Sequence, residues 1–324
     1  MHSKACPQCN CTRKVIKYGK QSGRQRYYCK DCKAVFQNKK RPQKLIKSIW
    51  NDFVFNNMSA EVLAEKHDKH PNTIRKIINN YEIDTYADLS KLSSKEKDNI
   101  SVIIMDATYF GRDSGYLVVI NAHNGRLLYF KEFKGSETNL EYWLALKALR
   151  DAKIHPKACV IDGRRGVREM LEESGIAVQY CLFHVDLEMK RCLTRNPILL
   201  PNIELRNIVK ALTSKHSRIN RKTFECLFYG WSIKYALWLQ ERDENGDFSH
   251  TRTRKLVNYI KRNLMYFFTF QDYPELKIPR TSNRIEGKFG NAKTKLKLHR
   301  GYSKSLRTKI FFSLLSGRTE MDNN

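Results

Sequence analysis

Apolar positions in the first quarter of the chain recur at the spacing of α-helices. They predict one helix over residues 45–53, a short helix after Ser59, and a third helix that begins at Pro71. A polar segment, residues 67–70, separates the last two. Three helices in this order are typical of a helix-turn-helix, and an ordinary three-helix bundle is the alternative.

From residue 100 the pattern changes to that of β-strands. Apolar runs predict three strands, over residues 100–105, 116–120 and 126–133, and Asn124-Gly125 predicts a hairpin turn between the last two. Two helices and two further strands follow, over residues 140–149, 167–173, 158–161 and 177–180. Three antiparallel strands, a crossover helix and a parallel strand predict an α/β fold with a ribonuclease-H-like core.

Residues 197–279 return to helical spacing. Three amphipathic segments there predict an all-helical insertion within the core. A further helix follows around residues 281–293, in which Ile285, Phe289 and Ala292 form an apolar stripe and Ser282 can provide the N-cap. This last helix returns the chain to the sheet.

Four of the nine cysteines form two Cys-x-x-Cys pairs near the N-terminus. Cys6 and Cys9 form the first pair, Cys29 and Cys32 the second, and 19 residues separate the pairs. This spacing predicts a zinc ribbon with one structural Zn²⁺ held by four thiolates. Cys11 is an alternative ligand to Cys9. Two disulfides are the other alternative, which we disfavour because nothing directs the chain to an oxidising compartment.

The charge of the chain indicates a polyanionic partner. Sixty Lys and Arg residues stand against 33 Asp and Glu, a formal net charge of +27. The excess lies at the two flanks, with 18 basic and 6 acidic residues in 1–82, and 11 and 1 in 280–318. We therefore expect DNA as the partner. No apolar run reaches the roughly 18 residues of a membrane span, so we expect no membrane partner.

The basic flank at the N-terminus contains residue types that contact bases and phosphates. They come from the second half of the ribbon and from the polar face of the third predicted helix. The candidate DNA-binding residues are Arg24, Arg26, Asn72, Thr73, Arg75, Lys76 and Asn79.

Two aspartates follow apolar strands of the predicted core. Asp106 follows the strand over 100–105, and Asp162 follows the strand over 158–161. These strands are neighbours in a ribonuclease-H-like sheet, so their ends bring the two carboxylates together, where carboxylate oxygens suit Mg²⁺. The alternative is that each aspartate caps a helix or lies solvated in a loop.

The third carboxylate must come from a later helix. Glu286 is the only acidic residue between 280 and 318, it lies beside the apolar stripe, and Lys293 is seven residues further along the same face. Glu188 is the nearest competitor. A solvated glutamate on a charged helix is the alternative interpretation.

Together these motifs resemble bacterial insertion-sequence transposases of the DDE class, in the Mutator-like branch. The resemblance covers nearly the whole chain: the ribbon with CPQC and YYCKDC, the helix-turn-helix, MDATYF, VIDGRRGV, YCLFH and TSNRIEGKFGNAK. In that branch a Cys-x-x-His follows the second aspartate, as Cys181 and His184 do here. The family also has a basic residue seven positions after its glutamate, which Lys293 matches.

The resemblance implies a role for each of these residues. Asp106, Asp162 and Glu286 would be catalytic and would hold two Mg²⁺ or Mn²⁺ ions. Cys181 and His184 would support the active site. Lys293 and Arg284 would hold phosphates near the metals.

The activity implied is Mg²⁺-dependent cleavage at the terminal repeats of a mobile element, followed by attack of the freed 3′-OH on target DNA. We expect double-stranded DNA partners, at least a homodimer on DNA, and a cytoplasmic, nucleoid-associated bacterial protein. Two rival functions are a non-catalytic, sequence-specific DNA-binding regulator derived from such an enzyme, and a nuclease or resolvase on the same core.

The predicted domains are the zinc ribbon (1–41), the helix-turn-helix domain (42–83), a linker (84–98), the first part of the core (99–196), the helical insertion (197–279) and the second part of the core with the Glu286 helix (280–324).

Overall fold

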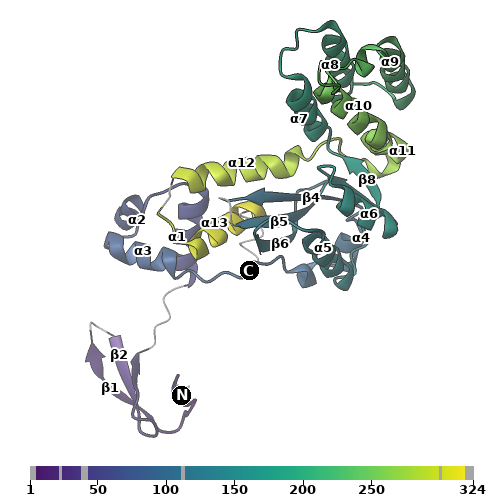
Figure 1. Cartoon of the computed structure of the whole chain (residues 1–324). Helices are drawn as coiled ribbons and strands as arrows, with labels where there is room; N and C mark the ends of the chain where they lie inside the picture. The colour runs from purple at the N-terminus through teal and green to yellow at the C-terminus, as the bar shows by residue number, and fades with distance from the viewer. Residues whose placement is uncertain (1–4, 22–23, 38–42, 111–113, 299–300, 318–324) are drawn as a thin grey trace. The chain divides into compact units, whose positions relative to one another are not determined.

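A computed structural model describes residues 5–21, 24–37, 43–110, 114–298 and 301–317 of the chain. By its internal contacts the chain divides into two compact units, Met1–Glu82 and Ile83–Asn324. Figure 1 labels their helices and strands. The division falls one residue before the predicted end of the helix-turn-helix domain.

The first unit begins with a small antiparallel sheet in the order β1-β2-β3. Its strands are β1 (Val15–Gln21), β2 (Arg24–Cys29) and β3 (Val35–Gln37). Tyr27 of the central strand pairs with Phe36, and their rings stack with centroids 5.8 Å apart. Packing between these two rings therefore forms part of the small apolar core of this sheet.

Three helices complete the first unit: α1 (Gln43–Phe55), α2 (Ala60–Lys66) and α3 (Pro71–Asn79). Ser59 caps α2 by accepting a hydrogen bond from the N–H of Val62, and Pro71 occupies the first turn of α3. The three helices contact one another and bury Trp50, Leu63 and Ile74 completely. The predicted helices are present, and they pack around one apolar core.

The second unit is built on a five-stranded mixed sheet in the order β6-β5-β4-β7-β8. The strands are β4 (Val102–Tyr109), β5 (Ser114–Asn121), β6 (Leu127–Lys134), β7 (Ala158–Ile161) and β8 (Ala177–Tyr180). β5 runs antiparallel to both of its neighbours, whereas β7 pairs in parallel with β4 and with β8. This order and direction confirm the predicted α/β fold with a ribonuclease-H-like core.

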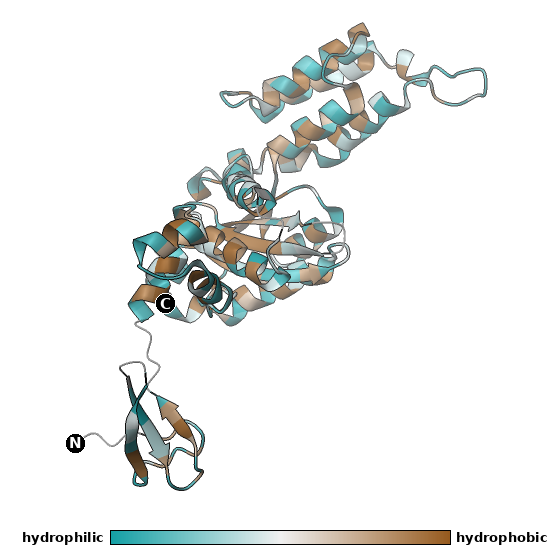
Figure 2. Cartoon of the chain, turned by 90° about the vertical axis from the view of Figure 1, so that its left-hand side faces the viewer, coloured by the Kyte–Doolittle hydropathy of each residue, from teal (hydrophilic) through white to brown (hydrophobic). Residues whose placement is uncertain are grey.

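Both faces of the sheet are covered, which explains the continuous apolar runs of its strands. Ile103 and Met105 of β4 belong to the core shared with α5 (Asn139–Asp151) and α6 (Arg165–Glu173). On the opposite face α12 (Asn283–Leu298) contacts β4, and α13 (Lys304–Ser316) contacts β6. Figure 2 shows the strands of this sheet as mostly hydrophobic between their helices.

A group of helices follows β8 and precedes α12 in the sequence. Its main helices are α7 (Leu182–Leu193), α8 (Leu200–Thr213), α9 (Arg221–Lys234) and α10 (Thr251–Asn263), with shorter turns η2 (Trp238–Gln240), η3 (Leu264–Phe267), α11 (Thr269–Asp272) and η4 (Pro274–Leu276). α7 packs on α8 and α10 (Figure 1), so by its contacts it belongs with these helices, although we predicted it as part of the core. Trp231 is buried, and its ring N–H donates to the carbonyl of Pro201.

One detail differs from the expectations. The segment expected as a linker, 84–98, contains a short 3-10 turn, η1 (Leu89–Lys91), and the helix α4 (Ser94–Asp98). On α5 the buried face is formed by Tyr142, Ala145, Leu146 and Leu149, whereas Leu140 and Trp143 are exposed. The apolar residues of a helix therefore mark its buried face only where a neighbouring element covers them.

Candidate functional site

Asp106 and Asp162 come from two neighbouring parallel strands. Ile104 of β4 pairs with Val160 of β7; Asp106 lies two residues further along β4, and Asp162 directly follows Ile161, the last residue of β7. Because side chains two residues apart in a strand share a face, Asp106 lies on the face of β4 that α12 covers, opposite Ile103 and Met105. Asp162 follows β7 as predicted, whereas Asp106 lies within β4, which continues to Tyr109 because these residues still pair with β5.

A glycine lets the chain turn directly after Asp162. Gly163 has a φ of +105°, and a Cβ at this position would lie 3.2 Å from the ring of Tyr180. The N–H of Arg164 then donates to Asp162 Oδ1 at 3.2 Å. The turn therefore places a backbone N–H against the exposed Asp162 carboxylate, and the backbone of Gly163 packs against the ring of Tyr180.

The charges around Asp106 define the centre of the site. Burial raises the pKa of Asp106, and the negative charges of Asp162 and Glu286 raise it further, to about 7, although His184 opposes the shift. Two carboxylates that raise the pKa of a third indicate a site with excess negative charge. A divalent cation would relieve this excess, and an all-oxygen ligand set fits Mg²⁺ or Mn²⁺.

Glu286 reaches the site from the first turn of α12. Its Oε1 lies 3.8 Å from Nδ1 of His184 and 3.9 Å from Sγ of Cys181, and the hydroxyl of Ser282 contacts the same oxygen. Nδ1 of His184 is buried and has no hydrogen-bond partner among the described residues. The structure thus brings together both residues of the Cys-x-x-His motif with Glu286.

The competing acid, Glu188, lies in a different environment. It is on α7, where Lys255 contacts its carboxylate at 3.1 Å and Arg191 forms a second ion pair. These two cations lower the pKa of Glu188, against the effect of burial. Its negative charge is therefore already balanced by Arg191 of α7 and Lys255 of α10.

The two basic residues expected to hold phosphates lie on α12 away from Glu286. Lys293 is exposed, and its Nζ lies 5.9 Å from the ring centroid of Phe110, just beyond the end of β4. Arg284 is also exposed, and its aliphatic chain lies against Gly125 in the β5–β6 turn. No contact joins either side chain to the carboxylates in the described part of the chain, and their phosphate-binding role stays a prediction.

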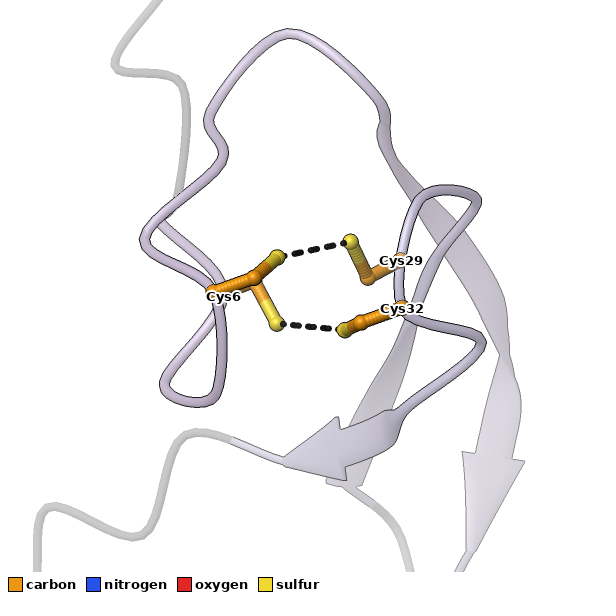
Figure 3. Close-up of side chains that lie close together, drawn as sticks. Cys6, Cys29 and Cys32 are labelled. Carbon is orange, nitrogen blue, oxygen red and sulfur yellow. Dashed lines mark hydrogen bonds between the residues drawn. The ribbon is translucent and has the colours of Figure 1, made fainter.

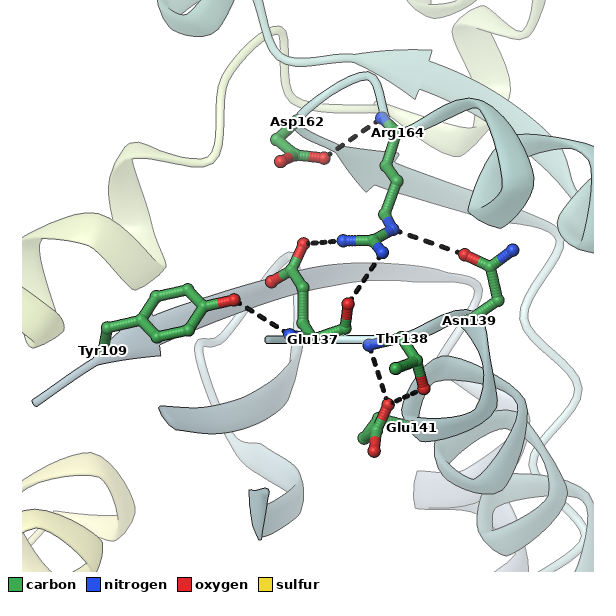
Figure 4. Close-up of polar contacts among 7 residues, drawn as sticks. All are labelled: Tyr109, Glu137, Thr138, Asn139, Glu141, Asp162 and Arg164. Carbon is green, nitrogen blue, oxygen red and sulfur yellow. Dashed lines mark hydrogen bonds and ion pairs between the residues drawn. The ribbon is translucent and has the colours of Figure 1, made fainter. Parts of the chain in front are cut away.

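Sequence reasoning missed a polar network beside Asp162 (Figure 4). Arg164 pairs with the carboxylate of Glu137, donates to its carbonyl at 2.7 Å, and reaches Asn139 at 3.3 Å. The hydroxyl of Tyr109 accepts from the N–H of Glu137 at 3.0 Å. This network ties the β6–α5 turn to the Asp162 turn. A solitary Glu or Arg in a loop gives no periodic signal, so only the fold reveals it.

A second missed residue is Tyr142 of α5, which is only 2% exposed. Its electrostatic neighbours are Glu137, Asp162 and Asp106, and its hydroxyl forms no hydrogen bond with any described residue. Burial and these carboxylates raise its pKa, so the phenol stays protonated. The phenol is therefore a neutral group close enough to the acidic residues to feel their charge.

The four predicted zinc ligands form one group in the first unit (Figure 3). Sγ of Cys6 lies 3.5 Å from Sγ of Cys32, and the same distance separates Cys9 from Cys29. These separations are too long for disulfides and close to the roughly 3.8 Å of thiolates that share one zinc. The group could bind Zn²⁺, and it contains Cys9 rather than Cys11.

The candidate DNA-binding residues fall in two places. Asn72, Arg75, Lys76 and Asn79 are exposed on α3 and Thr73 is half-buried; Arg75 pairs with Glu61 of α2. In the sheet, Arg26 lies over the ring of Tyr18, 5.2 Å from its centroid. The side chain of Arg24 lies outside the described part of the chain.

No helix among the described residues is long and apolar enough to cross a membrane. The sequence matches no protein-family model and no curated protein. The chain is similar to a solved structure of the Drosophila P element transposase strand transfer complex, with 10% sequence identity and a TM-score of 0.45 over 86% of this chain and 92% of that chain. It is also similar to the catalytic core domain of BIV integrase, with 13% identity and a TM-score of 0.21 over 51% of this chain and 99% of that one.

Proposed function

We propose that this chain is a DDE transposase that cleaves DNA at the ends of a mobile element and joins the freed 3′-OH to target DNA. One observation carries the proposal: Asp106 of β4 is electrostatically coupled to Asp162, which follows the neighbouring parallel strand β7, and to Glu286 of α12. These three carboxylates would form a ligand set for the cations that phosphodiester chemistry requires.

Asp106, Asp162 and Glu286 would hold the cations. A pair of Mg²⁺ or Mn²⁺ ions bound there would neutralise charge at the attacking and leaving oxygens of an in-line displacement. The chain itself keeps Nδ1 of His184 3.8 Å from Oε1 of Glu286.

The remaining parts of the chain would bind DNA. The zinc ribbon and α3 of a helix-turn-helix would recognise the terminal repeats, and the basic residues of α12, including Lys293 and Arg284, would hold backbone phosphates. Joining two element ends requires at least a dimer on DNA. A bacterial insertion sequence of the Mutator-like branch would place the protein in the cytoplasm, on the nucleoid.

The test uses DNA fragments from both flanks of the gene that encodes the chain. Each labelled fragment is incubated with the full chain, a supercoiled target plasmid and Mg²⁺. Cleavage at discrete positions followed by covalent joining to the plasmid supports the transposase. Cleavage without joining indicates a nuclease or resolvase, and specific binding without any cleavage indicates a DNA-binding regulator.

A further inference from the structure

Cys181 lies at a junction of the elements that carry the candidate active-site residues. Its N–H donates to the carbonyl of Ile161, the residue before Asp162, at 2.8 Å. Its own carbonyl accepts from the N–H groups of His184 and Val185 at 3.0 and 3.2 Å, which begins α7. The backbone of this one residue therefore connects the end of β7 with the helix that carries His184.

The side chain of Cys181 connects the same point to α12. Its Sγ accepts a hydrogen bond from the backbone N–H of Ser282 at 3.2 Å, and the Ser282 hydroxyl lies 3.0 Å from it. Both residues are buried, Cys181 completely and Ser282 to within 2%. The N–H of Leu182 also donates to the carbonyl of Arg280 at 2.9 Å, so two links join segments about 100 residues apart in sequence.

Ser282 in turn contacts the carboxylate of Glu286. Its hydroxyl lies against Glu286 Oε1, one helical turn later, and its carbonyl accepts from the N–H of Glu286 at 3.1 Å. We expected Ser282 to cap α12 with its hydroxyl. The hydroxyl instead contacts Cys181 and Glu286, and the sulfur accepts the otherwise unpaired N–H at the start of the helix.

We propose that Cys181 is a positioning residue that acts through Ser282 to fix the Glu286 carboxylate for cation binding, and that its sulfur is not a cation ligand. The inference rests on the proposed function, because it assigns Glu286 to a cation. The N–H of Ser282 already donates to the sulfur, and Mg²⁺ prefers oxygen ligands. Partners that orient a ligand in this way typically contribute 10-fold to 100-fold to metal affinity.

The competing assignment is a site for a transition-metal ion. The ligand atoms of Cys181, His184 and Glu286 all lie within 4.8 Å of one another. Such a mixture of sulfur, nitrogen and oxygen suits Zn²⁺ or Co²⁺ rather than Mg²⁺. The two assignments differ in what a hydroxyl in place of the thiol should do, because a serine still accepts hydrogen bonds but binds transition metals poorly.

The test measures Mn²⁺ binding by electron paramagnetic resonance to the full chain, with zinc bound at the ribbon cysteines. We expect Cys181→Ala and Ser282→Ala each to weaken Mn²⁺ binding about tenfold. Cys181→Ser should stay within about threefold of the unmodified chain, because its hydroxyl still accepts from Ser282. The double variant should lose less than the two single losses combined, since the two residues share the path through Ser282, while the sulfur also contacts Glu286 Oε1 directly at 3.9 Å.

Cys159→Ala is the matched control. Cys159 is also completely buried, but it points to the opposite face of the sheet on β7. Its loss should lower the melting temperature as much as that of Cys181 without changing Mn²⁺ affinity. This comparison separates positioning of Glu286 from a general effect on the core.

Three results would overturn the inference. Cys181→Ala could bind Mn²⁺ as the unmodified chain does. Cys181→Ser could lose binding as fully as Cys181→Ala while abolishing a sulfur-to-Co²⁺ absorption band, which would make the sulfur a ligand. If the unmodified chain binds no Mn²⁺ that Asp106→Asn removes, the proposed function itself fails, and the positioning role fails with it.

Discussion

The proton affinity of Asp106 links the geometry of the site to a measurable property. Its carboxyl group is half-buried beside two other acids, and its pKa is raised from 3.8 to about 7. The folded chain therefore keeps a proton there over a pH range in which the unfolded chain has lost it. The stability contributed by this proton is complete below about pH 4 and is lost as the pH rises through 7.

We therefore expect Asp106→Asn to change the pH dependence of stability without added divalent cations. In the unmodified chain the free energy of unfolding of the Ile83–Asn324 unit should fall between pH 5 and pH 8 by about 2 kcal/mol more than in the variant. A pKa shift is worth about 1.4 kcal/mol per unit when it counts in full. The expected difference is smaller because solvent screens the partly exposed Asp106. Urea unfolding at both pH values measures it, and parallel slopes would contradict the shift.

The assignment of Glu286 as the third cation ligand predicts a large and selective effect. Glu286→Gln keeps the shape of the side chain and removes its charge, so the variant should fold and bind DNA. Because a lost metal ligand costs several kcal/mol of transition-state stabilisation, the rate of strand cleavage should fall about 10³-fold or more. Gel assays of cleavage on end-containing DNA measure this loss.

Glu188→Gln is the matched control for that variant. Glu188 already pairs with Lys255 and Arg191, so neutralising it should lower stability by about 1 kcal/mol or less and leave cleavage intact. Normal cleavage by Glu286→Gln together with an inactive Glu188→Gln would exchange the two assignments.

At the scale of single residues, a site residue could be predicted from the sequence only where a local pattern marked it. Asp106 and Asp162 each end an apolar run, and Glu286 is the one acid in a basic segment, so the sequence marks all three. Tyr142 and Glu137 have no such mark, since an aromatic residue on a helix and an acid in a loop are common. Their proximity to Asp162 follows only from how α5 packs on the sheet.

At the scale of elements, the strands were predictable because their apolar runs are short and bounded by turns. The β5–β6 turn is an example: Gly125 adopts a φ of +75°, as the Asn-Gly pair predicts. The place of α7 was not predictable, because its apolar residues can pack equally well on a sheet or on helices. Its contacts with α8 and α10 decide this only in three dimensions.

The ribbon is the element whose stability depends most on a ligand. Its sheet has three short strands, and such a sheet buries too little apolar surface to fold alone. The N–H groups of Gln8 and Cys9 overcome the effect of burial and lower the pKa of Cys6 to about 7, which favours the thiolate that zinc requires.

We expect one tightly bound zinc ion per chain, and chelation should unfold residues 5–37 while the second unit stays folded. Cys29→Ser should release the metal, whereas Cys226→Ser, a change at an exposed cysteine of α9, should retain it. Elemental analysis of the purified variants measures the zinc content. An unchanged zinc content in Cys29→Ser would exclude the ribbon assignment.

At the scale of the whole molecule, the charge and the chemistry are divided between separate parts of the chain. The first unit combines a strongly basic composition with α3, whose polar face is exposed. The second unit holds the acidic cluster together with the basic residues of α12. Selective recognition and strand chemistry should therefore be separable, because each unit has its own core.

Deletion of residues 1–82 tests this division. The shortened chain should lose its preference for element ends, because α3 and the ribbon are absent. It should keep weak binding to any DNA through residues 280–318, and this binding should fall steeply as salt rises, because each phosphate contact releases bound counterions. Competition binding with end-containing and random fragments, at several salt concentrations, measures both properties.

Lys76→Ala in the full chain is the companion variant, which should reduce binding and its salt dependence by about one phosphate contact. A shortened chain that still prefers element ends would place recognition in the second unit.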